Sequence, residues 1–161
     1  MGKVQGLNCP KCMQGYPVEI EERRCERCHY ILEIEVDLSD LEWKGPEGVL
    51  HRTDRSIWRW REFLPIEKEG AVVTLGEGGT PLVPAERLRR EMGGAEVYLK
   101  NDTVLPTGSL KDRSNAVAIS RAIEEGRAVV AVASTGNAAA SVAAYAARAG
   151  LQSVVFVPEA T

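Results

Sequence analysis

The chain has 161 residues, a formal net charge of −3 and 44% hydrophobic residues, which indicates a soluble globular protein with one ordinary domain and a small appendage. This net acidity argues against non-specific binding to nucleic acid. The N-terminus has no apolar core of signal-peptide length, and no run of about 18 apolar residues is available to span a membrane, so we expect a cytoplasmic protein.

Four cysteines near the N-terminus form two C-x-x-C pairs. They are Cys9, Cys12, Cys25 and Cys28. In the cytoplasm such cysteines are more often metal ligands than disulfide partners, and two tight turns facing each other supply the four thiolates of a tetrahedral zinc site. The run 30–38 alternates apolar and acidic residues, as a strand does. We therefore predict a zinc ribbon over residues 1–38, in which a structural zinc compensates for a small core.

Two other interpretations of these cysteines remain open. Residues 25–29, "CERCH", spell the c-type haem attachment pattern, although haem attachment needs export and leaves the first pair unexplained. A nucleic-acid-binding ribbon is the other, but residues 1–36 carry more acidic than basic side chains. Met13 and His29 occupy the positions where zinc knuckles often have a glycine with positive φ.

Residues 39–70 are predicted to be a linker followed by an aromatic helical segment. Glycine and proline mark the linker at 40–50. The stretch 53–66 is predicted to form an amphipathic helix that Pro65 ends. Its arginines alternate with tryptophans, which can stack on bases, but the overall charge favours a docking surface with buried rings. The next stretch, "TLGEGGTPLVP" at 74–84, is a glycine-rich loop that matches neither the Walker nor the dinucleotide motif.

From residue 71 onward the chain is predicted to be an α/β domain. The expected elements are strand 95–100, helix 109–126, strand 128–133, helix 134–150 and strand 153–158. This β-α-β-α-β order predicts a parallel sheet with right-handed crossovers. The continuous apolar run 128–133 is expected to be buried on both faces, and glycines are expected to end both helices.

The stretch "TGSLKDRSN" at 107–115 predicts a helix start that carries a lysine. Ser109 and Asp112 match the capping box, and Gly108 allows a tight turn before it. Lys111 then lies in the first helical turn, where the helix dipole disfavours a positive charge. Such a site favours the neutral, reactive amine, although a solvated surface lysine remains the simpler interpretation.

The stretch "ASTGNAA" at 133–139 follows the apolar strand, at the sheet edge where open α/β proteins bind ligands. Ser134 and Thr135 lead into a helix N-terminus, whose free N–H groups bind anions. Asn137 can donate to an oxygen or accept from an amine. An ordinary helix cap explains these residues equally well. The two loops together predict one ligand crevice.

Three stretches together resemble the fold-type II pyridoxal-phosphate enzymes, and among them the threonine synthases most closely. They are "LGEGGTPL", "PTGSLKDR" and "ASTGNAAASVAAYAARAG", and the N-terminal zinc ribbon and aromatic segment also occur in many threonine synthases. The resemblance covers residues 7–161. It departs from the usual pattern at Leu105, where the family usually has asparagine, and at Ser114, where it usually has glycine.

The resemblance implies a site and a reaction. Lys111 would form the Schiff base with pyridoxal phosphate, and Asn137 would hydrogen-bond the ring hydroxyl oxygen. Ser134, Thr135 and Gly136 would bind the substrate carboxylate, with Thr80 near the substrate. O-phosphohomoserine and water would then give threonine and phosphate.

Family members are more than twice as long as this chain. The resemblance therefore implies an N-terminal part of a longer enzyme, inactive alone, whose full-length form is a homodimer with a small amino-acid substrate. Threonine dehydratase and cysteate synthase remain alternatives within the family. A non-catalytic protein, in which a zinc ribbon and half-domain bind a partner, is the alternative outside it.

Overall fold

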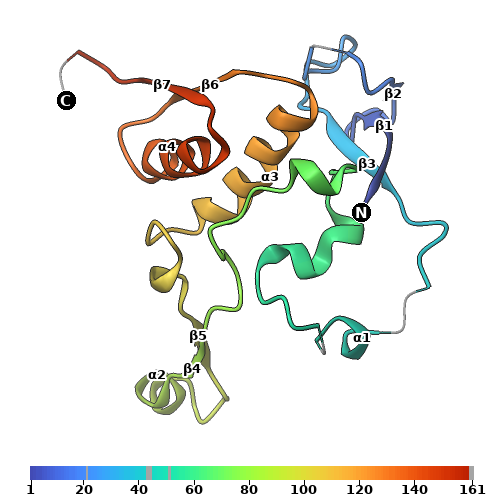
Figure 1. The fold of residues 1–161 in the computed structure, drawn as a ribbon. Coiled ribbons are helices and arrows are strands. Elements are labelled where there is room, and N and C mark those ends of the chain that lie inside the picture. Colours follow the sequence, from blue (N-terminus) through green and yellow to red (C-terminus); the bar gives the residue numbers. More distant parts are fainter. Residues whose placement is uncertain (21, 43–44, 51, 160–161) are drawn as a thin grey trace. The chain divides into compact units, whose positions relative to one another are not determined.

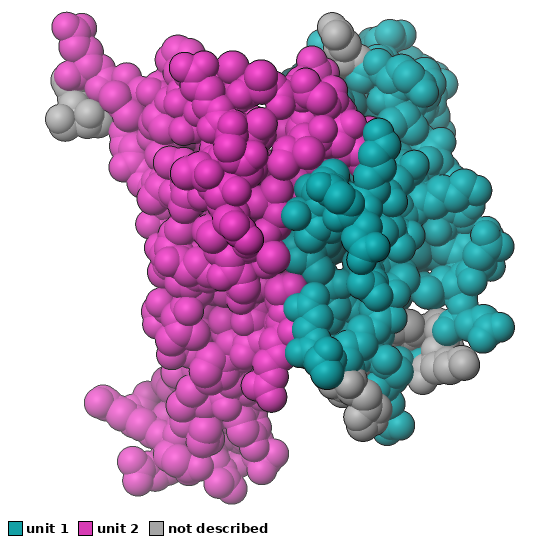
Figure 2. All heavy atoms as spheres, in the orientation of Figure 1, with its two compact units in different colours: residues 1–54, 58–72 teal, residues 55–57, 73–161 magenta. Residues whose placement is uncertain are grey.

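The computed structural model describes residues 1–20, 22–42, 45–50 and 52–159. Residues 43 and 44 of the predicted linker lie outside the described residues. The chain divides into two compact units, one of Met1–Asp54 and Trp58–Val72 and one of Arg55–Ile57 and Val73–Thr161 (Figure 2). No helix in the described ranges is long and apolar enough to cross a membrane.

The first unit contains a three-stranded antiparallel sheet with β1 (Lys3–Asn8) at its centre (Figure 1). β2 (Gly15–Tyr16) and β3 (Glu33–Asp37) pair with its two edges, and β3 confirms the strand predicted in the run 30–38. Most apolar side chains of that run are nevertheless exposed. The buried core consists instead of Leu7, Cys9, Cys25 and Leu32. Half of this small core is therefore cysteine.

The aromatic segment follows α1 (Glu47–Leu50) and precedes the short 3-10 helix η2 (Glu69–Ala71). It is not the predicted α-helix but the 3-10 helix η1 (Ile57–Phe63), which is interrupted at Trp60. An α-helical bond to the carbonyl of Arg61 would need an N–H at Pro65, and proline has none. The N–H of Gly2 donates to that carbonyl at 2.9 Å.

Trp58 in this segment is only 4% exposed, which supports the docking interpretation over base stacking.

The second unit contains the predicted α/β elements. β6 (Val129–Ala133) and β7 (Gln152–Phe156) pair in parallel, with Val129 opposite Gln152. α4 (Asn137–Ala149) connects them and packs on α3 (Lys111–Glu124). Gly126 and Gly150 follow the two helices at φ of 72°, so the predicted glycine stops are confirmed. The α/β fold class with parallel strand pairing is confirmed as well.

One predicted strand lies elsewhere. β5 (Tyr98–Lys100) has the expected position in the β-α-β-α-β order, but it pairs antiparallel with β4 (Leu82–Pro84) and not with β6. The two strands flank α2 (Glu86–Glu91), so β5 finds a partner close in sequence. The 3-10 helix η3 (Asp102–Val104) then leads into the turn before α3.

The expectation that 128–133 is buried on both faces is wrong for the described chain. No residue of β6 is buried, and Val129 is 48% exposed. On β7, Val154, Val155 and Phe156 are also exposed. The physical reason is that α4 is the helix that packs on this strand pair among the described residues, and one helix layer covers one face. The strand pair therefore presents an uncovered apolar surface.

Candidate functional site

Lys111 is the first residue of α3, and its side chain is exposed. Gly108, at φ of 73°, forms the turn before it and donates its N–H to the carbonyl of Leu105 at 2.8 Å. The hydroxyl of Ser109 accepts from the N–H of Lys111 at 3.3 Å. The turn therefore presents the lysine at the open end of the helix, beside backbone N–H groups that favour an anion.

The predicted capping box is not formed. Leu110, not Ser109, is the N-cap of α3, and no side chain caps it. The carboxylate of Asp112 instead closes the preceding turn, since it accepts from the N–H of Thr107 at 2.7 Å and from the Thr107 hydroxyl. The carboxylate is fully buried, so this bond defines the local backbone.

The second predicted loop precedes α4. The N–H of Ser134 donates to the carbonyl of Phe156 at 3.1 Å, which anchors the loop to the end of β7. The hydroxyl of Ser134 accepts from the N–H of Gly136 at 3.2 Å. Thr135, Gly136 and Asn137 are exposed, and Asn137 is the first residue of α4. These groups remain accessible to a ligand at the helix N-terminus.

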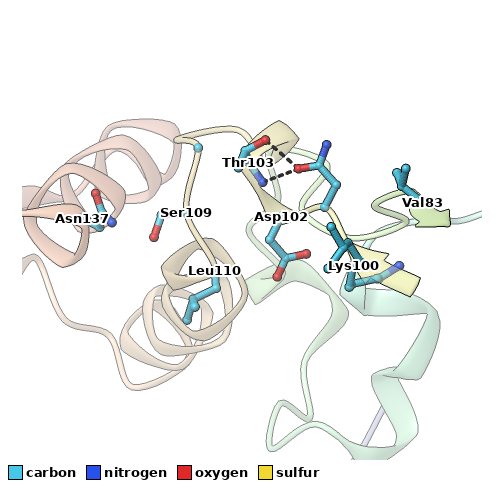
Figure 3. Close-up of a pocket in the computed structure, with 10 residues that line it drawn as sticks. Val83, Lys100, Asp102, Thr103, Ser109, Leu110 and Asn137 are labelled. Carbon is cyan, nitrogen blue, oxygen red and sulfur yellow. Dashed lines mark hydrogen bonds between the residues drawn. The ribbon is translucent and has the colours of Figure 1, made fainter. Parts of the chain in front are cut away.

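A pocket of about 590 Å³ lies between the lysine turn and the β4–β5 strand pair (Figure 3). It is lined by Val83, Leu99, Lys100, Asn101, Asp102, Thr103, Gly108, Ser109, Leu110 and Asn137. Asn137 and Ser109 lie on one side of it, and Val83 and Lys100 on the other. The structure thus brings Asn137 to the lysine turn. Lys111, Thr80 and Ser134–Gly136 are not among the lining residues.

Thr80 is buried beneath this pocket wall in a polar network that the sequence did not reveal. Its hydroxyl donates to Asp102 Oδ1 at 2.9 Å and accepts from Arg113 Nη2 at 3.2 Å. Arg113 also donates to both carboxylate oxygens of Asp102, at 2.5 and 2.8 Å. Lys100 Nζ donates to the carbonyl of Thr80.

The network has a clear electrostatic effect on Asp102. The hydrogen bonds from Arg113 lower the pKa of Asp102 to about 2, although partial burial opposes this. The carboxylate is therefore ionised throughout the neutral range. Arg113 directly follows the lysine–aspartate pair in sequence, but no spacing rule connects it to Asp102, eleven residues earlier. This is why the sequence analysis missed the pair.

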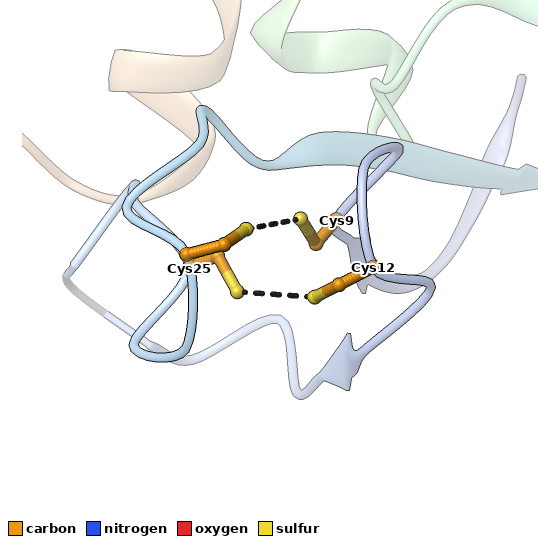
Figure 4. A group of neighbouring side chains, drawn as sticks. Cys9, Cys12 and Cys25 are labelled. Atoms are coloured by element: carbon orange, nitrogen blue, oxygen red, sulfur yellow. Dashed lines mark hydrogen bonds between the residues drawn. The ribbon is translucent and has the colours of Figure 1, made fainter.

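The four cysteines come together in the first unit (Figure 4). Their sulfur atoms all lie within 4.8 Å of one another, which allows one metal ion to contact all four. The two turns are alike, since Met13 N–H donates to the Cys9 carbonyl at 2.8 Å and His29 N–H donates to the Cys25 carbonyl at 2.7 Å. Met13 and His29 have φ of 58° and 57°, the conformation for which knuckles often use glycine.

Tyr16 is a neighbour of the cluster that the sequence analysis did not single out. Its hydroxyl donates to Cys25 Sγ at 3.2 Å and accepts from the N–H of Glu26 at 3.1 Å. The bond from Tyr16 lowers the pKa of the Cys25 thiol to about 6 and raises that of Tyr16 to about 12. The geometry therefore favours a thiolate at Cys25.

The family model for pyridoxal-phosphate dependent enzymes matches residues 73–161. The chain belongs to this family. The match covers the glycine-rich loop, the lysine turn and the loop before α4. The predicted resemblance to the pyridoxal-phosphate enzymes is therefore confirmed.

Several curated relatives are named threonine synthase. The chain is 44% identical to the threonine synthase of Methanocaldococcus jannaschii over 151 residues, 94% of this chain and 37% of the relative. It is 38% identical to that of Methanosarcina acetivorans, over 94% of this chain and 36% of the relative. It is 48% identical to that of Halalkalibacterium halodurans, over 65% of this chain and 30% of the relative. The aligned part of the chain thus spans only 30% to 37% of the length of these relatives.

Proposed function

We propose that the chain is part of a pyridoxal-phosphate-dependent threonine synthase, which converts O-phosphohomoserine and water into threonine and phosphate. The observation that carries the proposal is that Lys111 and Asn137 are the first residues of two packed helices beside one pocket of about 590 Å³. The names and identities of the relatives support this choice of substrate within the family.

The residues present fit pyridoxal phosphate. Lys111 offers an exposed amine at a helix start, and Asn137 lines the pocket with an amide that can bond a ring hydroxyl oxygen. When bound, the cofactor supplies an electron sink for carbanion chemistry. The Ser134–Gly136 loop, in which Thr135 and Gly136 are exposed, would hold the substrate carboxylate at the N-terminus of α4. Thr80 would lie near the substrate. It is buried behind Asp102, which lines the pocket and accepts the hydrogen bond from the Thr80 hydroxyl.

We further propose that the four-cysteine cluster holds a structural zinc ion. The four sulfur donors in two like turns fit a closed tetrahedral site, and the small core of the first unit explains why a metal is needed. The whole enzyme would be longer than residues 1–161, with the apolar surface of β6 and β7 covered by its other parts.

The test uses the whole natural protein with pyridoxal phosphate and two alternative substrates. Threonine synthase activity releases threonine and phosphate from O-phosphohomoserine, whereas a dehydratase produces a keto acid from threonine. Lys111→Ala is expected to abolish the reaction, and Lys3→Ala, at a 72% exposed side chain, serves as the matched control. Keto-acid formation alone, or equal activity of the two variants, would contradict the proposal.

A further inference from the structure

The buried face of α4 carries two hydroxyl groups that bind two different carboxylates. Ser141 and Tyr145, one helical turn apart, are both fully buried. Ser141 Oγ donates to Asp112 Oδ1 at 2.7 Å, and the Tyr145 hydroxyl donates to Glu77 Oε2 at 2.8 Å. Each bond joins α4 to a different part of the second unit. The two contacts are alike in burial and chemistry. They differ in the segment that is joined to α4, which is α3 for Asp112 and the glycine-rich loop for Glu77.

Asp112 and Glu77 are both completely buried, and neutral groups supply their hydrogen bonds. Besides α4, Asp112 accepts from Thr107, and Glu77 accepts from Thr74 and from the N–H of Leu75. Among the described residues, no lysine or arginine lies within ion-pair distance of either carboxylate. The hydroxyls of Ser141 and Tyr145 therefore supply a large part of the hydrogen bonding that stabilises these two buried carboxylates.

The two contacts differ in their distance along the chain from the candidate site. Asp112 directly follows Lys111, and Ser141 lies one turn after Asn137 on the same face of α4. The Ser141–Asp112 bond therefore sets the spacing between the lysine turn and the start of α4. Asn115 Nδ2, which donates to the carbonyl of Ala138 at 3.5 Å, holds the two helices together at the same level.

We propose that Asp112 is a positioning residue for Lys111, since its buried carboxylate locks the first turn of α3 to α4 through Ser141 and to the preceding turn through Thr107. This inference rests on the proposed function. Glu77 and Tyr145 make an equivalent contact that does not touch the lysine turn. Burial and the neighbouring Glu77 raise the pKa of Tyr145, so its hydroxyl keeps its proton.

The experiment compares Ser141→Ala with Tyr145→Phe in the whole protein. Both variants remove one buried hydroxyl from the same face of α4, so both are expected to lower Tm. Pyridoxal phosphate is added well below Tm, borohydride traps the adduct, and mass spectrometry gives the rate of labelling at Lys111. We expect Ser141→Ala to slow this labelling about tenfold and Tyr145→Phe to change it less than about twofold.

A second pair of variants covers the case in which Ser141→Ala fails to fold. Thr107→Val removes the hydroxyl and keeps the shape of the side chain, whereas Thr107→Ser keeps the hydroxyl. Labelling at Lys111 is expected to fall in the valine variant and to recover in the serine variant. Tyr98→Phe, at a residue 50% exposed, is the control for a change without a buried contact.

The outcomes separate this inference from the proposed function. Labelling of Lys111 in the natural protein, with equal rates in Ser141→Ala and Tyr145→Phe, would overturn the positioning role alone. A difference of less than about twofold in the labelling rate between Thr107→Val and Thr107→Ser would also overturn the positioning role. No labelling of Lys111 in the natural protein would overturn the proposed function, and the positioning role with it.

Discussion

Replacing Arg113 by methionine tests the polar network beneath the pocket. The substitution keeps an apolar stem but removes the guanidinium that donates to both oxygens of Asp102, at 2.5 and 2.8 Å. Asp102 would keep the hydrogen bond from Thr80 and lose its main stabilising partner. The pKa of Asp102 should then rise from about 2 toward its ordinary value of 3.8.

The pKa shift gives the magnitude. A change from 3.8 to about 2 is worth roughly 2.5 kcal/mol of stability, at about 1.36 kcal/mol per pKa unit. The side chains of Arg113 and Asp102 are 30% and 28% exposed, so solvent screening reduces the effect. We therefore expect Arg113→Met to lower the free energy of unfolding by about 1–2 kcal/mol at pH 7.

Urea unfolding at several pH values provides the assay. Because the folded-state pKa of Asp102 is depressed, its stabilisation is complete above pH 3.8 and is lost as the pH falls toward about 2. The difference between the natural protein and Arg113→Met should shrink over the same window. Arg87→Met is the control, since the Arg87–Glu91 pair is 87% and 58% exposed and should contribute less than about 0.5 kcal/mol. Equal losses in the two variants, or a pH-independent difference, would refute the reasoning.

Three further predictions concern the metal cluster and two glycines. Tyr16→Phe should weaken binding of the proposed zinc ion about 10- to 100-fold in a chelator competition, because it removes the hydrogen bond to Cys25 Sγ. Tyr30→Phe, at an exposed residue, should leave this affinity unchanged. Gly78→Ala should lower Tm markedly more than Gly15→Ala, since φ at Gly78 is +135° and an added Cβ would lie 2.6 Å from a backbone oxygen, whereas Gly15 has open space. Gly136→Ala should leave Tm nearly unchanged, because nothing lies within 4 Å of the added Cβ, but it should raise KM if the substrate carboxylate approaches this backbone. An unchanged KM would remove that loop from the substrate site.

The helices and strands of the second unit could largely be predicted from the sequence, because their signals are local. Apolar runs, helix-length spacing and terminal glycines mark α3, β6, α4 and β7 to within a few residues. The partner of β5 could not be predicted, since pairing depends on which strand lies beside it in space. The 3-10 form of η1 was not predicted either, and the N–H of Gly2 that bonds the Arg61 carbonyl comes from a residue far away in sequence.

The candidate site was predictable where a motif is contiguous and hidden where it depends on tertiary contacts. Lys111 and Asn137 stand out because each begins a helix after a distinctive turn. Asp102 and Arg113 meet across η3 and the lysine turn, and no periodicity reveals that contact. Ser109 and Asp112 matched a capping box by spacing alone. In the structure the buried Asp112 carboxylate accepts instead from the N–H of Thr107.

The proposed function requires that Lys111 holds pyridoxal phosphate. Lys100 is the competing lysine, because it lines the pocket of about 590 Å³. Lys111 is not among the lining residues but begins α3 directly after Leu110, which is one of them. The most direct measurement is borohydride reduction of the whole protein with pyridoxal phosphate, followed by peptide mass spectrometry. We expect the reduced cofactor on Lys111 in the natural protein and in Lys100→Ala, and none at this pocket in Lys111→Ala. Cofactor bound to Lys100, or label spread evenly over exposed lysines, would contradict it.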